Sequence, residues 1–470
     1  MANHSIAIVG AGFSGTLMAL HLMHRSPPGT RIVLIERNAP FGPGLAYSTG
    51  NPNHLLNVPA GRMSAFEDRP RDFLEWLERQ PALVLDGVEP TEAAFVPRRL
   101  FGAYLRHLLN VATLSQTPNR LELVQDSVLA IEHDSDGLEL RFASGRFMRV
   151  DRAVLATGNQ RPEPVPVNEP SFYDSALWHP DPWAPNAFTD LSPEAPLLLI
   201  GTGLTMVDAV IALLDQGHAG PIHAVSRRGL VPRAHTAPTP AGKAAPLAYP
   251  SDIAKLTRLL RQRVARAVAA GHAWQSEIDA LRPATQALWR TMPEHQRARF
   301  LRHLRPWWDV HRHRMPQPIA TRIDDALSRG QLRIHAGRIC GYEITDRMVD
   351  VRFRPRGNEQ TAVLRVARVV NCTGPATCYE RITDPLVQHL VTTGLARADA
   401  LGLALDVTDE CALLSRAGEA SQRMFAVGPL TKGAFWEITA VPDIRRQSAA
   451  LATHLSRSMQ EPSRILHHAA

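Results

Sequence analysis

The six residues Gly10-Ala11-Gly12-Phe13-Ser14-Gly15 have the spacing of a loop that binds a dinucleotide. In such a loop Gly10 permits a tight turn, Gly12 lets the backbone approach a pyrophosphate, and Gly15 lets a helix pack closely on a strand. The helix that begins here would offer free N–H groups and a partial positive charge to phosphates. Glu36, about 20 residues further along, is placed to accept hydrogen bonds from the adenosine ribose. A purely structural turn is the alternative.

A second and looser copy of this pattern is Gly201-Thr202-Gly203-Leu204-Thr205-Met206, with Met206 at the third glycine position. After the apolar run that follows it come Ser226, Arg227 and Arg228, where an acidic residue would recognise an unphosphorylated ribose. Guanidinium groups at this place suit a 2′-phosphate, so the sequence favours NADPH over NADH. A solvated basic turn is the alternative.

The elements that must position these loops are two strand–turn–helix–strand units. The first has a strand at 5–10, a helix at 13–25 and a strand at 31–36; the second has a strand at 196–200, a helix at 205–214 and a strand at 221–225. The strands are continuous apolar runs, which is typical of parallel strands buried on both faces. Two such units predict two dinucleotide sites in one chain.

The remaining elements are read from the same periodicities. We expect a loop at 232–251, helices throughout 252–329, strands at 332–335, 349–353, 366–371 and 424–427, and a helix at 443–455. The helical stretch carries many arginines and interrupts the second unit, so we expect it to be an insert.

Size and composition exclude several classes of protein. The chain has 470 residues and a formal net charge of +7, a length that predicts two to three globular domains. It has no run of about 20 apolar residues and no signal peptide, so we expect a soluble, cytoplasmic protein that makes no contact with a membrane. Aromatic residues are not interleaved with the basic ones, so nucleic-acid binding is not expected. Two bound dinucleotides account for the positive charge.

The four cysteines are scattered and form no CxxC pair. A flavin-linked disulfide reductase needs two thiols close together, and the nearest pair, Cys372 and Cys378, straddles a Gly-Pro turn. A redox-active disulfide is therefore not expected.

Three further segments, 41–47 (FGPGLAY), 54–64 (HLLNVPAGRMS) and 302–316 (RHLRPWWDVHRHRMP), resemble a family of FAD/NAD(P)-binding proteins. More distantly, the arrangement is similar to the class B flavin monooxygenases, among them enzymes that N-hydroxylate amines and amino acids. The resemblance implies an α/β fold with two Rossmann-like dinucleotide-binding domains, one for FAD and one for NADPH, and a helical insert. It also implies domain crossovers at 156–158 and 371–374, and a place for 426–428 near the ribityl chain. Pro429 stands where many relatives have Asp.

The implied domain order is an FAD-binding part at 1–190, an NADPH-binding domain at 191–368 with the insert at about 252–329, and a second FAD-binding part at 369–470. The motifs and the resemblance together predict these cofactor-binding residues: Gly10, Gly12, Phe13, Ser14, Gly15, Glu36, Arg37, Gly42, Gly44, Asn57, Met63, Val128, Thr157, Gly158, Gly201, Gly203, Leu204, Thr205, Ser226, Arg227, Arg228, Gly374 and Gly428.

Substrate and catalytic residues are harder to assign. A cationic cluster in the insert offers Arg305, Arg312 and His313 as carboxylate-binding candidates; a basic helix end that packs through its tryptophans is the alternative. The histidines of this cluster lack a fourth ligand, so no metal site is expected. The catalytic candidates are Asn57, Arg62, Trp436 and Glu437.

The reaction that this resemblance favours is NADPH-dependent N-hydroxylation of a small amine or amino acid. Molecular oxygen would be the co-substrate and a flavin C4a-hydroperoxide the oxygen donor, and the cofactor carries most of this chemistry. Two alternatives remain open: an NADPH reductase or dehydrogenase that passes electrons to a quinone or protein, and a flavin-binding protein without catalysis. The oligomeric state cannot be read from composition.

Overall fold

The computed structural model describes residues 4–115, 119–134, 136–184, 186–236, 249–376 and 382–460. The chain divides into two compact units. The first comprises the described residues of Met1–Gly50, Val58–Gln160 and Thr377–Ala470, and the second those of Asn51–Asn57 and Arg161–Ala376. The chain thus passes between the units near 160 and 377, close to the crossovers at 156–158 and 371–374 that the resemblance implies.

The first unit contains β1 (Ser5–Val9), α1 (Phe13–Arg25), β2 (Arg31–Glu36), α2 (Gly44–Tyr47), α3 (Asp72–Glu78), α4 (Ala82–Leu85), α5 (Arg98–Leu114), β3 (Arg120–Gln125), β4 (Val128–His133), β5 (Leu138–Phe142), β6 (Phe147–Val150), β7 (Arg152–Leu155), α13 (Pro385–Thr393), β15 (Ala412–Leu414), β16 (Ala420–Ala426) and α14 (Val441–Gln460).

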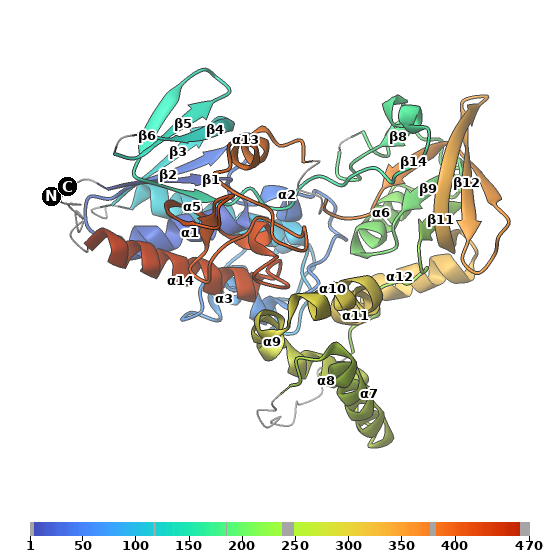
Figure 1. The fold of residues 1–470 in the computed structure, drawn as a ribbon. Coiled ribbons are helices and arrows are strands. Elements are labelled where there is room, and N and C mark those ends of the chain that lie inside the picture. The colour runs from blue at the N-terminus through green and yellow to red at the C-terminus, as the bar shows by residue number, and fades with distance from the viewer. Residues whose placement is uncertain are drawn as a thin grey trace. The chain divides into compact units, whose positions relative to one another are not determined.

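The main sheet of this unit has the strand order β15-β16-β7-β1-β2-β3, and all its neighbours are parallel except β15 and β16. The core residues of β1 and β2 are almost fully buried, as parallel strands covered on both faces require. Helices α1, α5 and α14 cover one face, and the antiparallel β4–β6 sheet lies over the other (Figure 1). Because β16 pairs with β7, the sheet is completed by residues from near the end of the chain.

The second unit contains β8 (Trp178–His179), β9 (Leu197–Ile200), α6 (Leu204–Asp215), β10 (Ile222–Ser226), α7 (Ile253–Ala269), α8 (Trp274–Leu281), α9 (Thr285–Thr291), α10 (Glu294–His303), α11 (Arg305–Arg312), α12 (Gln317–Ser328), β11 (Leu332–Thr345), β12 (Met348–Pro355), β13 (Ala362–Val366) and β14 (Arg368–Asn371).

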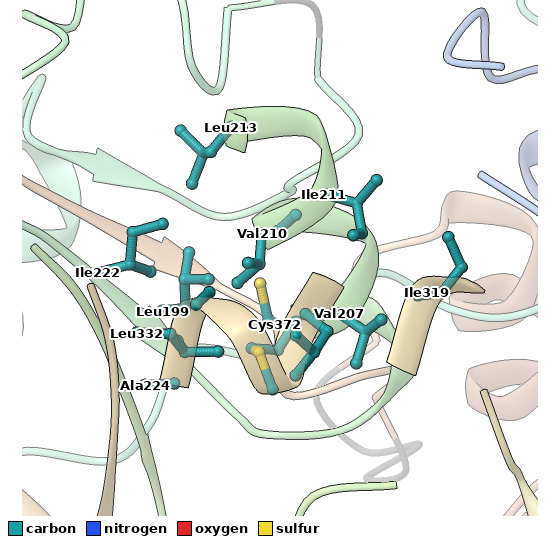
Figure 2. Packing of buried hydrophobic residues seen from close by; sticks show 14 of the residues in the cluster. Leu199, Val207, Val210, Ile211, Leu213, Ile222, Ala224, Ile319, Leu332 and Cys372 are labelled. Carbon is teal, nitrogen blue, oxygen red and sulfur yellow. The ribbon is translucent and has the colours of Figure 1, made fainter. Parts of the chain in front are cut away.

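Its sheet has the order β13-β12-β11-β10-β9-β14-β8, with β11, β10, β9, β14 and β8 parallel and β12 and β13 antiparallel. Alternate residues of β9 belong to two different hydrophobic cores, one on each face of the sheet. Leu197 and Leu199 pack under α6 and α12, and Leu198 and Ile200 pack on the opposite face. Figure 2 shows Leu199 in the first of these cores, with side chains from α6, from the neighbouring strands and from Ile319 of α12.

The expected helical insert is confirmed as α7–α12. It begins where the sequence predicts, because the Asp252 carboxylate accepts the Lys255 N–H and caps the first turn of α7. Backbone hydrogen bonds join the far end of the insert to the segment after β10: Met315 N–H donates to Arg233 O, and His235 N–H donates to Met315 O, each at 2.8 Å. The described parts of the expected loop, 232–236 and 249–251, form no helix or regular strand, and 237–248 lie outside the described residues.

One strand is much longer than expected. The predicted strand at 332–335 runs on to Thr345 as β11, because its second half leaves β10 and pairs antiparallel with β12, with a bulge between Ile339 and Gly341. The Ala-Gly-Arg sequence after His335 interrupts the apolar run, so periodicity alone ends the strand too early. In the described part of the chain, no helix is both long and apolar enough to span a bilayer.

Candidate nucleotide-binding sites

The glycine-rich loop after β1 has the conformation that its spacing predicts. Gly10 has φ +104°, and a Cβ there would lie 2.5 Å from Ala156 O. A Cβ on Gly15 would lie only 1.8 Å from Gly10 O, so α1 can pack on the turn only because this position carries no side chain. Gly44 packs directly against this loop, because a Cβ added at Gly44 would lie 2.8 Å from the Cα of Gly12.

The N-terminus of α1 is open to an anion. Gly12 caps the helix without a side-chain hydrogen bond, and its first turn contains no acidic residue. Glu36 stands beside it at the end of β2, and its Oε2 accepts the Ala11 N–H at 2.8 Å. This bond fixes the carboxylate against the loop, where its other oxygen also accepts the Asn38 N–H at 3.3 Å. A helix N-terminus with a neighbouring carboxylate suits a pyrophosphate and the hydroxyls of a ribose.

Other predicted residues meet at the same edge of the first sheet, because the carboxyl ends of its parallel strands coincide there. Thr157 and Gly158 follow β7, and Val128 comes shortly after β3. The Thr157 hydroxyl is buried and has no hydrogen-bond partner in the described structure. A buried orphan hydroxyl beside a nucleotide loop is what a missing ligand would leave.

Gly428 brings the C-terminal segment to this loop. It has φ +73°, and a Cβ there would lie 2.3 Å from Ser14 Oγ of α1. Its N–H donates to Gln447 Oε1 at 2.7 Å, and Gln447 Nε2 donates to Thr431 Oγ1 at 2.8 Å. Thr431 in turn donates to Gly428 O, which closes a buried network. No sequence signal marks Gln447, since a single helix residue shows its role only once α14 is folded against the loop.

Four other predicted residues have evident structural contacts. Arg37 forms a 3.1 Å ion pair with Asp384. Met63 is 2% exposed and belongs to the core. Phe13 packs edge-on against Tyr47 at 6.0 Å between ring centroids. Gly42 has φ +108° and donates its N–H to Ala11 O at 2.8 Å, so it shapes the loop.

The second loop repeats the first within the other unit. Gly201 has φ +110°, and its Cβ would lie 2.3 Å from Cys372 O, the counterpart of the Gly10–Ala156 contact. Gly203 begins α6 without a side-chain cap or an acidic first turn, and a Cβ there would meet nothing within 4 Å. Leu204 and Thr205 are half-buried in the first turn of α6, and Gly374 follows β14 with φ +86° and open space beside it. Met206 stands at the position of the third glycine, and its side chain is buried in the hydrophobic core of this unit.

A hydroxyl network connects this loop to the turn after β10. Thr202 Oγ1 donates to Leu230 O at 2.5 Å, so the 2.8 Å contact between Thr202 and Ser226 has Ser226 as its donor. Ser226 Oγ also accepts the Gly229 N–H at 3.0 Å. Ser226 therefore uses its only O–H on Thr202, while its oxygen holds the turn that carries Arg227 and Arg228 by accepting the Gly229 N–H. Ser226 therefore positions the turn after β10. Thr202, which the sequence motif does not single out, contributes to the same hydrogen-bond network.

The catalytic candidates fall in different places. Trp436 and Glu437 are 4% and 6% exposed in the first unit, with Lys432 Nζ 5.3 Å from the Trp436 ring centroid. Glu437 has φ +63°, a left-handed conformation that is unfavourable for a residue with a side chain. Arg62 is exposed at the end of a short 3-10 helix. Asn57 belongs to the second unit, where its backbone O accepts a 3.1 Å hydrogen bond from His235 Nε2.

The substrate candidates Arg305, Arg312 and His313 all lie on or just after α11. The Nε of Arg305 is 3.4 Å from Asp309 Oδ2, one helical turn away. His313 ends the helix, donating its N–H to Asp309 O. All three are half-buried.

The thiols do not form a reductase centre in the described residues. Cys372 is 3% exposed and lies beside Val207 and Val210 in the second-unit core (Figure 2). Burial holds the pKa of this thiol well above its usual range, which disfavours the reactive thiolate. Cys378 lies outside the described residues.

Comparison with known proteins agrees with this geometry. Residues 7–160 match a family described as FAD-NAD(P)-binding. No curated protein sequence matches the chain.

Several solved structures share the fold over nearly the whole chain. The ornithine hydroxylase of Pseudomonas aeruginosa aligns with a TM-score of 0.66 at 15% identity, covering 98% of this chain and 100% of that one. The ornithine N-hydroxylase of Kutzneria sp. 744 gives 0.67 at 15%, covering 97% and 100%. The cadaverine monooxygenase of Erwinia amylovora, solved with FAD, gives 0.67 at 12%, covering 97% and 95%.

The predicted fold class and the predicted resemblance are thus confirmed. Residues 7–160 match the FAD-NAD(P)-binding family, and the chain as a whole shares its fold with the solved ornithine and cadaverine enzymes named above.

Proposed function

We propose that this protein is an FAD-containing, NADPH-dependent monooxygenase that N-hydroxylates a small amine or amino acid. The observation that carries the proposal is the likeness of the whole chain, both nucleotide loops included, to ornithine and cadaverine hydroxylases. The first loop would hold FAD and the second NADPH. Bound FAD would supply the redox chemistry, accepting electrons from NADPH and passing them to oxygen.

The chain's own residues would bind and orient the two nucleotides. The N–H groups at the start of α1, whose first turn contains no acidic residue, would bind the FAD pyrophosphate, and Glu36 would accept hydrogen bonds from its ribose. The orphan Thr157 hydroxyl offers a further donor at this edge. Gly428, held by Gln447, would bring backbone against the same ligand. This role does not require the Asp that Pro429 replaces.

The buried residues after Gly428 have the surroundings that oxygen chemistry requires. Trp436 and Glu437 are almost fully excluded from solvent, and exclusion of water protects reactive intermediates from wasteful hydrolysis. We propose that this segment shields the reacting end of the flavin. The few titrating groups near the loops fit a reaction in which the protein mainly positions the cofactor and the substrate.

The first experiment is anaerobic reduction of the yellow holoprotein by NADPH, followed by rapid mixing with oxygenated buffer. We expect NADPH to bleach the flavin, and an absorbing transient to precede the return of the oxidised spectrum. With ornithine, lysine or cadaverine, consumption of NADPH should then yield hydroxylamine product. Direct return of the oxidised spectrum, with fast turnover of an artificial quinone, would favour the reductase alternative. Flavin that NADPH cannot bleach would contradict both.

The NADPH preference should depend on the turn after β10. Replacing Arg227 and Arg228 together by alanine should raise the KM for NADPH by about tenfold or more and leave the KM for NADH nearly unchanged, because only NADPH carries the 2′-phosphate. Steady-state kinetics with both nucleotides measures this ratio. An unchanged ratio would show that this turn does not recognise the phosphate.

A further inference from the structure

A cavity of about 720 Å³ opens in the second unit beside the turn after β10. Its lining comes from four separate segments of the chain and contains a single acidic residue and six arginines: Arg227, Arg228, Arg302, Arg338, Arg354 and Arg356. We call it the arginine cavity. The sequence motif singles out only Arg227 and Arg228 of these residues.

Two of the arginines face each other across a strand pair. In the antiparallel register of β11 and β12, Arg338 lies directly opposite Arg354. Directly opposed residues share one face of the sheet with Cβ atoms about 4.5–5.5 Å apart, and like charges at such positions are destabilising. Both side chains are exposed, and neither has an acidic partner in the described structure.

The neighbouring arginines of the same sheet are arranged differently. Arg352, two residues before Arg354, lies 3.3 Å from Glu343 of the adjacent strand. Arg365 lies 3.3 Å from Asp350 across the next pair of strands. The sheet therefore pairs arginine with carboxylate away from the cavity and arginine with arginine at the cavity. Such a local excess of positive charge is explained by an anionic ligand that would neutralise it.

The position of the cavity identifies the anion. The parallel half of β11 ends at Ala336, alongside the end of β10, so Arg338 lies at the same sheet edge as Arg227. At this edge, beyond the second strand of a dinucleotide-binding unit, lies the adenosine ribose. The Thr202–Ser226 network ties the same turn to the glycine-rich loop.

We propose that Arg338 and Arg354, joined by Arg302 from α10 of the insert, bind the 2′-phosphate of NADPH and determine the preference for this nucleotide. The inference rests on the proposed function and assigns its specificity to the β11–β12 hairpin and the insert, beyond the turn after β10. A phosphate monoester carries close to two negative charges at neutral pH and accepts paired N–H donors from guanidinium groups.

The test compares two ligands that differ only in this phosphate, 2′,5′-ADP and 5′-AMP. Calorimetric titration of the FAD-loaded protein should give tighter binding of 2′,5′-ADP. Arg338→Ala and Arg354→Ala should each weaken 2′,5′-ADP binding by roughly tenfold to a hundredfold and leave 5′-AMP binding unchanged. Arg352→Ala, on the same strand and face but paired with Glu343, is the matched control and should change neither affinity.

Thermal unfolding separates this role from a structural one. Since each substitution removes a repulsion, Tm should stay the same or rise in Arg338→Ala and Arg354→Ala while 2′,5′-ADP affinity falls. Unchanged 2′,5′-ADP affinity in these two variants, or an equal loss with 5′-AMP, would overturn the inference. Flavin reduction by NADPH in such variants would leave the proposed function standing. Conversely, wild type that binds 2′,5′-ADP tightly but never transfers electrons to FAD would remove the proposed function alone.

Discussion

Replacing Gly15 by alanine is expected to abolish FAD binding, because the added Cβ would lie 1.8 Å from Gly10 O and 3.3 Å from Ala156 Cβ. Neither the turn nor the helix can move aside without separating α1 from the strand ends on which the nucleotide would lie. We expect the cost in unfolding free energy to be at least about 3 kcal/mol, at the high end for overpacking. The flavin-to-protein absorbance ratio of the purified protein and its unfolding curve measure the two effects.

Two matched variants separate the collision from other effects of losing a glycine. Gly145, in the exposed turn between β5 and β6, has φ +82°, and a Cβ added there would meet nothing within 4 Å, so Gly145→Ala should cost only about 1–2 kcal/mol and retain FAD. Gly12→Ala meets its nearest atom at an ordinary 3.4 Å, so it should fold normally yet bind FAD poorly, because its methyl group would occupy the path of the pyrophosphate. Full flavin content in Gly12→Ala would refute the assignment of this loop.

Replacing Asp279 by asparagine is expected to destabilise the helical insert strongly. Arg314 is 4% exposed, and its Nη2 lies 2.6 and 2.7 Å from the two oxygens of Asp279. In the described structure Asp279 is the only carboxylate that Arg314 contacts. Asp279→Asn would leave a buried guanidinium without a counter-charge, a situation that costs about 3–5 kcal/mol. Limited proteolysis of the insert and chemical unfolding measure the effect.

The reverse substitution is the control. Arg314→Met removes the buried charge and leaves Asp279, whose side chain is 42% exposed, in contact with water. We therefore expect Arg314→Met to be less destabilising than Asp279→Asn, although both break the same ion pair. Equal losses would mean that the pair acts only through its mutual attraction, and that burial of Arg314 carries no separate cost.

Local pattern was enough to predict the elements that carry the nucleotide loops. Helix α1 begins at Phe13 and β2 ends at Glu36 as expected, because both positions are marked by short-range signals, a glycine turn and an apolar run. The sequence pattern also predicts the second glycine-rich loop, although Met206 stands at its third glycine position. The structure explains this tolerance, since the Met206 side chain turns into the core instead of toward the loop.

What the sequence could not supply was the pairing of distant segments. The opposition of Arg338 and Arg354 depends on the register of the β11–β12 hairpin and on the bulge between Ile339 and Gly341, neither of which has a periodic signal. The role of Gln447 depends on α14 returning to Gly428. Arg305 and its neighbours, like the catalytic candidates, are predicted from charge and resemblance, which specify no geometry.

The order in which the strands are synthesised has a consequence for how this protein matures. The first unit lacks one of its parallel strands, β16, until residues 420–426 have left the ribosome, although β7 and β1 precede them by most of the chain. The second unit contains all its strands by Asn371. Domains fold as units during translation, so the later-encoded nucleotide unit is able to fold first. The earlier-encoded unit must wait with an unpaired strand edge, the kind of surface that chaperones protect.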